Sequence, residues 1–188
     1  MLLIIGRVGS GKEELAEKLE AKGYSVAKKF TTHKSIADNR RYCDYVDEKT
    51  ASERKNAIAQ SVVGDYIYYT TTDEVKDKDI LIVDPYAADK IAGTMPNEIF
   101  NIVYIQMDRE LRMHNEKKPY VAERNDAEED MYNEFEVRLS MRRRHEPNMF
   151  RKNIHKILVW KNNLKKVNED VAVEKAKELI DYENIYII

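Results

Sequence analysis

Short apolar runs alternate with segments of helical periodicity along this chain. The apolar runs cover residues 2–5, 25–30, 80–83, 102–107 and 157–160. The helical segments cover residues 12–22, 109–117 and 171–182, and Gly23 is well placed to end the first of them. Short apolar runs without strict alternation are typical of strands that are buried on both faces. The sequence therefore predicts an α/β fold in which helices cover both faces of a parallel sheet.

Two stretches break this rhythm and are interpreted as additions to one core. Residues 31–78 lie between the second and third apolar runs, and their tyrosine-rich segment at residues 64–74 predicts a short strand or one arm of a hairpin. Residues 116–130 are charged, contain Pro119, and are interpreted as a loop before a long helix from about residue 127 to residue 145. We expect a single domain with its core at residues 1–30, 79–115 and 146–188, an insert at residues 31–78, and the loop with its helix at residues 116–145.

Composition narrows the classes of function. The chain has 188 residues, of which 43% are hydrophobic and 35% are charged, and its formal net charge is -2. Because charges of both signs are mixed throughout, no nucleic-acid partner is expected. Cys43 is the single cysteine, which excludes an internal disulfide, and the sequence shows neither a signal-peptide pattern nor a long apolar run. We therefore expect a cytoplasmic protein without a membrane partner, as a monomer or a homodimer.

The stretch GRVGSGKEEL, at residues 6–15, is the most specific motif in the sequence. It matches the phosphate-binding loop pattern G-x-x-x-x-G-K-[ST] at seven of eight positions, after a buried strand and before a helix. Glycines let backbone N–H groups approach a triphosphate closely, and Lys12 supplies a positive charge. The alternative is a glycine-rich turn that holds no ligand. The predicted ATP-binding residues here are Gly6, Arg7, Val8, Gly9, Ser10, Gly11, Lys12 and Glu13.

Glu13 stands where the pattern has a serine or threonine hydroxyl, which is a neutral ligand of magnesium. A carboxylate is a good hard-oxygen ligand for Mg²⁺, and it suits the positive N-terminus of a helix. Without a metal, however, it repels a triphosphate. We therefore predict that Glu13 is a magnesium ligand and that nucleotide binding depends strongly on the metal.

The segment FTTHKSIADNRRYCDYV, at residues 30–46, resembles the acceptor-binding segment of the guanylate kinase family. In that family two threonines, two arginines, an acidic residue and a tyrosine hold the phosphate and base of the acceptor nucleotide. Thr32 and Tyr45 match this pattern, and Arg40 and Arg41 lie close enough in sequence to supply displaced positive charge. The positions of the two arginines, the acidic residue and a base-reading serine carry other residues, namely His33, Ile36, Asn39 and Lys29.

The resemblance extends over most of the chain through four later segments. The segment GDYIYYTT resembles a second acceptor-binding stretch, and ILIVD resembles the strand whose final aspartate lies near magnesium and the acceptor. EVRLSMRRRHE resembles the helix that follows the family's arginine-bearing lid, and ILVWKNN resembles the strand and loop that hold adenine. The residues implied by these matches are Tyr66 and Asp84 for the acceptor, Asp84 also for the metal, Arg124 and Arg138 as lid arginines, and Asn162 or Asn163 for the adenine base.

The resemblance implies transfer of the γ-phosphoryl group of ATP, with Mg²⁺, to a nucleoside monophosphate. Lys12 with Arg124 and Arg138 would neutralise the migrating group, while Thr32, His33 and their neighbours would hold the acceptor. Because the acceptor positions depart from the family, strict GMP specificity is not expected, and another nucleotide or a smaller phosphorylated metabolite fits as well. The alternatives are a non-catalytic guanylate-kinase-like module that binds proteins and, with less support, a nucleotide hydrolase. The two arginines also fit a solvated helix face.

Overall fold

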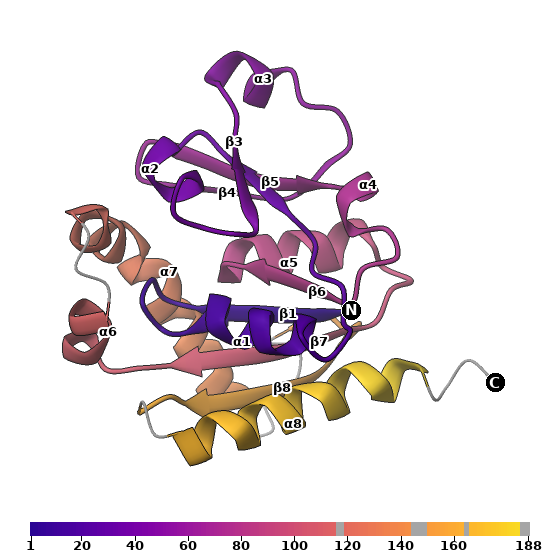
Figure 1. Cartoon of the computed structure of the whole chain (residues 1–188). Helices are drawn as coiled ribbons and strands as arrows, with labels where there is room; N and C mark the ends of the chain where they lie inside the picture. Colours follow the sequence, from indigo (N-terminus) through magenta and orange to yellow (C-terminus); the bar gives the residue numbers. More distant parts are fainter. Residues whose placement is uncertain (116–118, 144–149, 164–165, 185–188) are drawn as a thin grey trace.

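The computed structural model describes residues 1–115, 119–143, 150–163 and 166–184. Its centre is a four-stranded sheet in which all neighbouring strands are parallel, in the order β6-β1-β7-β8 (Figure 1). The strands are β1 (Leu2–Gly6), β6 (Ile80–Val83), β7 (Phe100–Gln106) and β8 (Ile154–Lys161). The predicted α/β class with a parallel sheet is confirmed.

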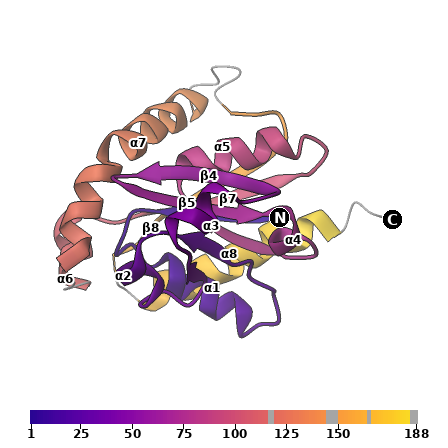
Figure 2. The ribbon, with the colours of Figure 1, turned by 90° about the horizontal axis from the view of Figure 1, so that it is seen from above.

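Helices cover both faces of this sheet, as Figure 2 shows from above. One face carries α1 (Lys12–Glu20) and α8 (Lys166–Asn184), and the other carries α5 (Pro85–Thr94) and α7 (Pro119–Arg143). Successive strand residues point to opposite faces, so Leu2 and Ile4 pack with α1 and α8 while Leu3 and Ile5 pack with α5 and α7. All four side chains are fully buried, which explains why the run is apolar without alternation.

The residues between α1 and β6 form a second four-stranded sheet, in the order β3-β2-β5-β4, which lies above the core sheet in Figure 1. Its strands are β2 (Lys29–Thr31), β3 (Cys43–Tyr45), β4 (Ala57–Val63) and β5 (Tyr66–Thr71). The short helices beside them are α2 (Lys34–Ala37), α3 (Glu48–Ser52) and α4 (Thr72–Val75). Strands β4 and β5 pair as an antiparallel hairpin around Gly64, which confirms the hairpin arm predicted at residues 64–74.

The predicted strand at residues 25–30 is wrong in its extent. Val26 forms an isolated parallel bridge to Ile80, and the Ala27 amide donates to the Ile80 carbonyl at 2.8 Å, but the chain then leaves the core sheet. Its last residues, from Lys29 onward, enter the second sheet as β2. The polar residues Lys28 and Lys29 explain this exit, because a central parallel strand must bury both of its faces.

Two helices also differ from the sequence-based prediction. Helix α5, between β6 and β7, was not predicted, and α7 begins at Pro119 rather than near residue 127, so residues 119–126 are helical rather than a loop. Proline is tolerated in the first turn of a helix, where its missing N–H would lack an intrahelical partner. Pro85 and Pro119 therefore begin helices here. Helix α6 (Arg109–Asn115) agrees with the prediction for residues 109–117, of which residues 116 and 117 lie outside the described part.

Replacing Gly23 by alanine is expected to lower the free energy of unfolding by about 1–2 kcal/mol, because the left-handed backbone conformation is less favourable by this amount for a residue with a β-carbon. Gly23 follows α1 with a φ of +99°, and a β-carbon there would meet no atom within 4 Å, so the cost is purely conformational. Urea unfolding measures it. Gly23→Asn should lose less because asparagine tolerates this region better. Equal stability of Gly23→Ala and wild type would contradict the left-handed conformation of Gly23.

Candidate functional site

Residues 6–12, here called the glycine loop, connect the carboxyl end of β1 to the N-terminus of α1. Gly9 and Gly11 have φ values of +77° and +93°, which side chains rarely adopt. A β-carbon at Gly9 would lie 2.7 Å from the Arg112 carbonyl oxygen, and one at Gly11 would lie 2.8 Å from the Asn162 side-chain nitrogen. Backbone shape therefore requires glycine at both positions, and close packing against the Arg112 backbone requires it at Gly9 as well.

The Lys12 side chain folds back over this loop. It is only 6% exposed, and its Nζ donates to the Arg7 carbonyl oxygen at 3.2 Å. Lys12 begins α1, and the first N–H groups of a helix have no partner within the helix. They form a partial positive charge beside the lysine, an arrangement that suits a phosphate.

Two side chains from distant segments donate hydrogen bonds in and beside the glycine loop. The Asn162 amide donates to the Ser10 carbonyl at 3.0 Å, and the Arg112 guanidinium donates to the carbonyls of Met107 at 3.1 Å and Val8 at 3.5 Å. Burial lowers the pKa of Arg112, and the nearby Arg7 acts in the same direction. Asn162 was predicted from the sequence as a base-binding residue, and here its amide also fixes the loop backbone. Arg112 was missed because nothing local distinguishes it from other helical arginines.

Helix α7 contacts the start of the same loop. The Tyr132 hydroxyl donates to the Gly6 carbonyl at 2.7 Å, and the Arg7 guanidinium lies 5.0 Å from the centre of the Tyr132 ring. Arg7 also donates to the Asn133 side chain at 3.0 Å. Tyr132 was not predicted, although its place on the buried face of α7 with Met131 is a helix-period signal that the sequence carries.

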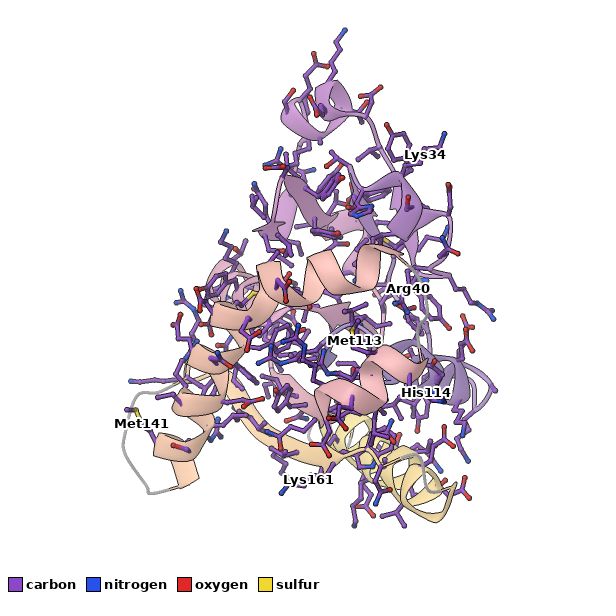
Figure 3. All side chains as sticks on the ribbon, turned by 90° about the vertical axis from the view of Figure 1, so that its left-hand side faces the viewer. Lys34, Arg40, Met113, His114, Met141 and Lys161 are labelled. Atoms are coloured by element: carbon purple, nitrogen blue, oxygen red, sulfur yellow. The ribbon has the colours of Figure 1, made fainter. Side chains whose placement is uncertain are left out.

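An open cavity of about 440 Å³, here called the loop-side cavity, begins at Arg7 and reaches the ends of β7 and β8. Its lining includes Arg7, Gln106, Asp108, Lys161, Asn162 and Asn163. This volume lies within the range of small-molecule sites. In Figure 3, Lys161 lies below α6 and Arg40 lies above it, beside the second sheet. The lining of this cavity brings together three of the predicted ATP-binding residues, Arg7, Asn162 and Asn163.

Glu13 is buried in the first turn of α1, with 7% of its surface exposed. Its Oε2 atom has no hydrogen-bond partner in the described part of the chain, and neither has the Ser10 hydroxyl. A buried carboxylate oxygen without a partner is costly. This orphaned hard oxygen fits a magnesium ion, for which Glu13 was predicted as a ligand. Among the described residues, however, no group of three or more His, Cys, Asp or Glu side chains could hold a metal ion.

A narrower space, here called the inter-sheet cavity, lies between the core sheet and the second sheet. Its volume is about 20 Å³, which suffices for about one water molecule. Its polar lining consists of Lys12, Lys29, Tyr68, Tyr69, Thr70, Asp84 and Tyr132. The structure thus brings two predicted residues, Lys12 and Asp84, to the same cavity at the carboxyl ends of β1 and β6.

Asp84 has two hydrogen bonds that fix its carboxylate. It accepts from the Ala87 amide at 2.8 Å, as the N-cap of α5, and from the Ser61 hydroxyl. Burial raises the pKa of the Asp84 carboxyl, and these two bonds oppose the rise. Ser61 follows an irregularity in β4, where the register shifts and Ala59 has a φ of +48°. This distortion helps to aim Ser61 at Asp84.

Replacing Asp84 by asparagine is expected to raise the free energy of unfolding at neutral pH, with a gain that grows as pH rises. The native pKa of the Asp84 carboxyl lies above its value in the unfolded chain, which is about 3.9. The stability that Asp84 contributes is therefore complete below about pH 3.9, where the carboxyl is protonated in both states. This stability is lost as the pH rises through the native pKa. Asparagine keeps an acceptor for Ala87 and carries no charge. Urea unfolding at several pH values tests this, with Asp65→Asn at the exposed hairpin turn as the control. An Asp84→Asn protein less stable than wild type at pH 8 would contradict it.

Several predicted acceptor residues are occupied by contacts within the protein. His33 caps α2 through its Nδ1, which accepts from the Ile36 amide at 3.4 Å, and its ring centre lies 3.9 Å from that of Tyr66. The Thr32 hydroxyl accepts from the Ile67 amide at 3.1 Å. These contacts join β2 to α2 and β5, so they stabilise the second sheet.

The remaining acceptor candidates lie around β3. The Arg41 guanidinium pairs with Glu20 of α1 at 2.7 Å, while Tyr45 is 48% exposed at the end of β3. Arg40 is half-buried before β3 and has contacts within the protein. None of these three residues is in the lining of either cavity described above.

Of the two predicted lid arginines, the structure describes the side chain of Arg138 alone. Arg138 of α7 forms a two-pronged ion pair with Asp89 of α5, and its guanidinium lies 4.6 Å from the centre of the Phe150 ring. These contacts join α7 to α5 and do not reach either cavity lining. The side chain of Arg124 lies outside the described part of the structure.

Comparisons with known proteins add little to this description. A scan against models of protein families finds no match to this chain, and a search of curated proteins finds none either. The chain is similar to the crystal structure of an uncharacterized protein from Eubacterium ventriosum ATCC 27560, with 15% sequence identity, over 96% of this chain and 98% of that chain. The TM-score is 0.40, and a likeness at this level carries no argument about fold or function. Within the described residues, no helix is both long and apolar enough to cross a membrane.

Proposed function

We propose that this protein is a nucleotide-binding phosphotransferase that transfers the γ-phosphoryl group of ATP to a nucleoside monophosphate. The observation that carries the proposal is the glycine loop, in which two left-handed glycines precede the N-terminus of α1 and Lys12 folds back over the backbone. Such a loop offers N–H groups and a point charge to a phosphate chain. The guanylate kinase resemblance of the sequence supports the same reaction.

Each part of the site has a place in this function. The loop-side cavity, which begins at Arg7, is large enough for the base and ribose of the donor nucleotide. Lys12 lines the inter-sheet cavity, so its ammonium can neutralise the group that passes between donor and acceptor. Glu13 would hold Mg²⁺, which supplies charge neutralisation of the phosphates when bound. The acceptor phosphate is already anionic, so no general base is required.

A second function, a non-catalytic module of the same architecture, is favoured by the internal pairing of predicted acceptor and lid residues. Arg41 binds Glu20, His33 caps α2, and Arg138 binds Asp89. Charges held in this way are not available to a substrate without rearrangement. In such a module the glycine loop would bind ATP or nothing, and no transfer would follow.

An ADP-release assay with ATP, Mg²⁺ and each common nucleoside monophosphate in turn distinguishes these functions. The proposed phosphotransferase produces ADP only when a suitable monophosphate is present, together with the matching diphosphate. ATP binding by calorimetry without ADP formation for any acceptor would support the module. Equal ADP formation with and without an acceptor would instead indicate a hydrolase.

A further inference from the structure

The lining of the inter-sheet cavity includes a basic side chain, Lys29, that has no role in the function described so far. Lys12 reaches this cavity from α1 on the core side, and Lys29 reaches it from β2 on the side of the second sheet. Among the described residues that line it, Asp84 is the only acidic one. The two lysines thus approach one space from the core and from the second sheet.

Lys29 differs from its basic neighbours Lys28 and Arg41 in having no ion pair among the described residues. Lys28, the preceding residue, is exposed and forms an ion pair with Asp44 at 2.9 Å, and Arg41 forms one with Glu20. In the part of the chain that the structure describes, no hydrogen bond or ion pair engages the Lys29 ammonium, although it is half-buried. Its attraction for Asp84 acts over a longer distance and lowers the pKa of that carboxyl.

The charges around the cavity favour an anion. The lining supplies two ammonium groups and one carboxylate, which accepts from the Ser61 hydroxyl and the Ala87 amide, while the buried Glu128 carboxylate, which also acts on Asp84, lies outside the lining. A phosphate monoester with two negative charges would complement the two lysines, and ammonium groups are common phosphate ligands. Hydroxyl groups of Tyr68 and Thr70 belong to the same lining.

The cavity in its present state, at about 20 Å³, is too small for a phosphate group. Binding therefore requires the second sheet to move away from the core. The two chain connections between the sheets run together at one point, where the Ser25 amide and hydroxyl donate to the Asp79 carboxylate at 2.7 and 2.8 Å. This joint ties residues 25 and 79 together, while the Ser61–Asp84 hydrogen bond, which joins β4 to the core, must open to admit a ligand.

We propose that Lys29 binds the phosphate group of the acceptor and pairs with Lys12 across the inter-sheet cavity. The inference rests on the proposed phosphotransferase function and assigns the acceptor phosphate to a residue of β2 rather than to His33, Arg40 or Arg41. The chemical class that it recognises is a phosphate monoester, with nucleoside monophosphates as the first candidates.

Calorimetric titration of wild type, Lys29→Met and Lys29→Arg with AMP, GMP, CMP, UMP and inorganic phosphate tests this assignment. Lys29→Met should weaken binding of the preferred monophosphate by about 10- to 100-fold, as expected for the loss of a charged hydrogen bond. Lys29→Arg should keep most of the affinity, because it keeps the charge. Lys28→Met is the matched control, since it removes the adjacent, exposed lysine and should leave the affinity unchanged. Thermal unfolding of each variant checks the fold.

A parallel titration with ATP separates this inference from the proposed function. If ATP binds normally and Lys29→Met binds the monophosphate as well as wild type does, the assignment of Lys29 is wrong while the function stands. If ATP does not bind to wild type but a monophosphate binds in a Lys29-dependent manner, the proposed function is wrong and the anion site remains. If wild type binds neither a monophosphate nor inorganic phosphate, the inference fails in either case.

Discussion

Replacing Lys12 by alanine is expected to lower ATP-dependent phosphoryl transfer by about 10³-fold or more, the size of effect that single charged groups have on phosphoryl-transfer transition states. Lys12 belongs to both parts of the site, because its ammonium caps the glycine loop through the Arg7 carbonyl and its side chain lines the inter-sheet cavity. A change there removes charge from donor and acceptor sides at once.

Steady-state kinetics of Lys12→Ala against wild type measure this loss. Lys18→Ala is the matched control, since Lys18 lies on the same helix and only forms a partly exposed ion pair with Glu169 at 2.6 Å. The control should turn over like wild type, and both variants should unfold cooperatively. Transfer by Lys12→Ala at the wild-type rate would remove the glycine loop from the mechanism.

Replacing Glu13 by serine is expected to raise ATP affinity in EDTA by up to about 10³-fold while changing it little in Mg²⁺. Two unit charges about 4 Å apart repel by about 4 kcal/mol at an effective dielectric constant of 20, and this repulsion acts when no metal lies between carboxylate and triphosphate. The burial of Glu13 and its orphaned Oε2 atom place the charge where water screens it poorly. A magnesium ion between the two groups would attract both the Glu13 carboxylate and the triphosphate, and so offset this repulsion.

Calorimetric titration of ATP into wild type and Glu13→Ser, each with Mg²⁺ and with EDTA, gives the four affinities needed. Glu14→Ser is the control, because Glu14 is the next residue in the same helical turn and is exposed. It should show only the small, salt-sensitive change of a surface charge. Wild type that binds ATP equally in Mg²⁺ and EDTA would show that Glu13 points away from the phosphates.

The segment from β1 to α1 could be predicted from the sequence because every signal in it is local. An apolar run, a set of glycines, a lysine and a helix follow one another within about twenty residues, and each limits the backbone near its own position. The same holds for the hairpin arm at residues 64–74, where the tyrosine-rich run and Gly64 indicate strand and turn. The parallel core followed from short apolar runs separated by helices.

The start of α7 was misjudged because proline serves two purposes. Pro119 indicated a loop, yet proline also begins helices, and α7 starts there. His33 stays a predicted phosphate ligand because of its position in the acceptor segment. In the structure its ring nitrogen caps α2, a role that depends on the orientation of one side chain.

The sequence by itself determined the class of fold, the β1 to α1 turn with Lys12 at its end, and the unusual carboxylate at Glu13. Only the tertiary structure decided which distant groups meet there: the Tyr132 hydroxyl on the Gly6 carbonyl, the Asn162 amide on the Ser10 carbonyl, and Lys29 beside Asp84. Local order follows from backbone sterics and side-chain periodicity over a few residues. Tyr132 and Gly6 are 126 positions apart, so their contact exists only because burying both faces of the core sheet packs α7 against the end of β1.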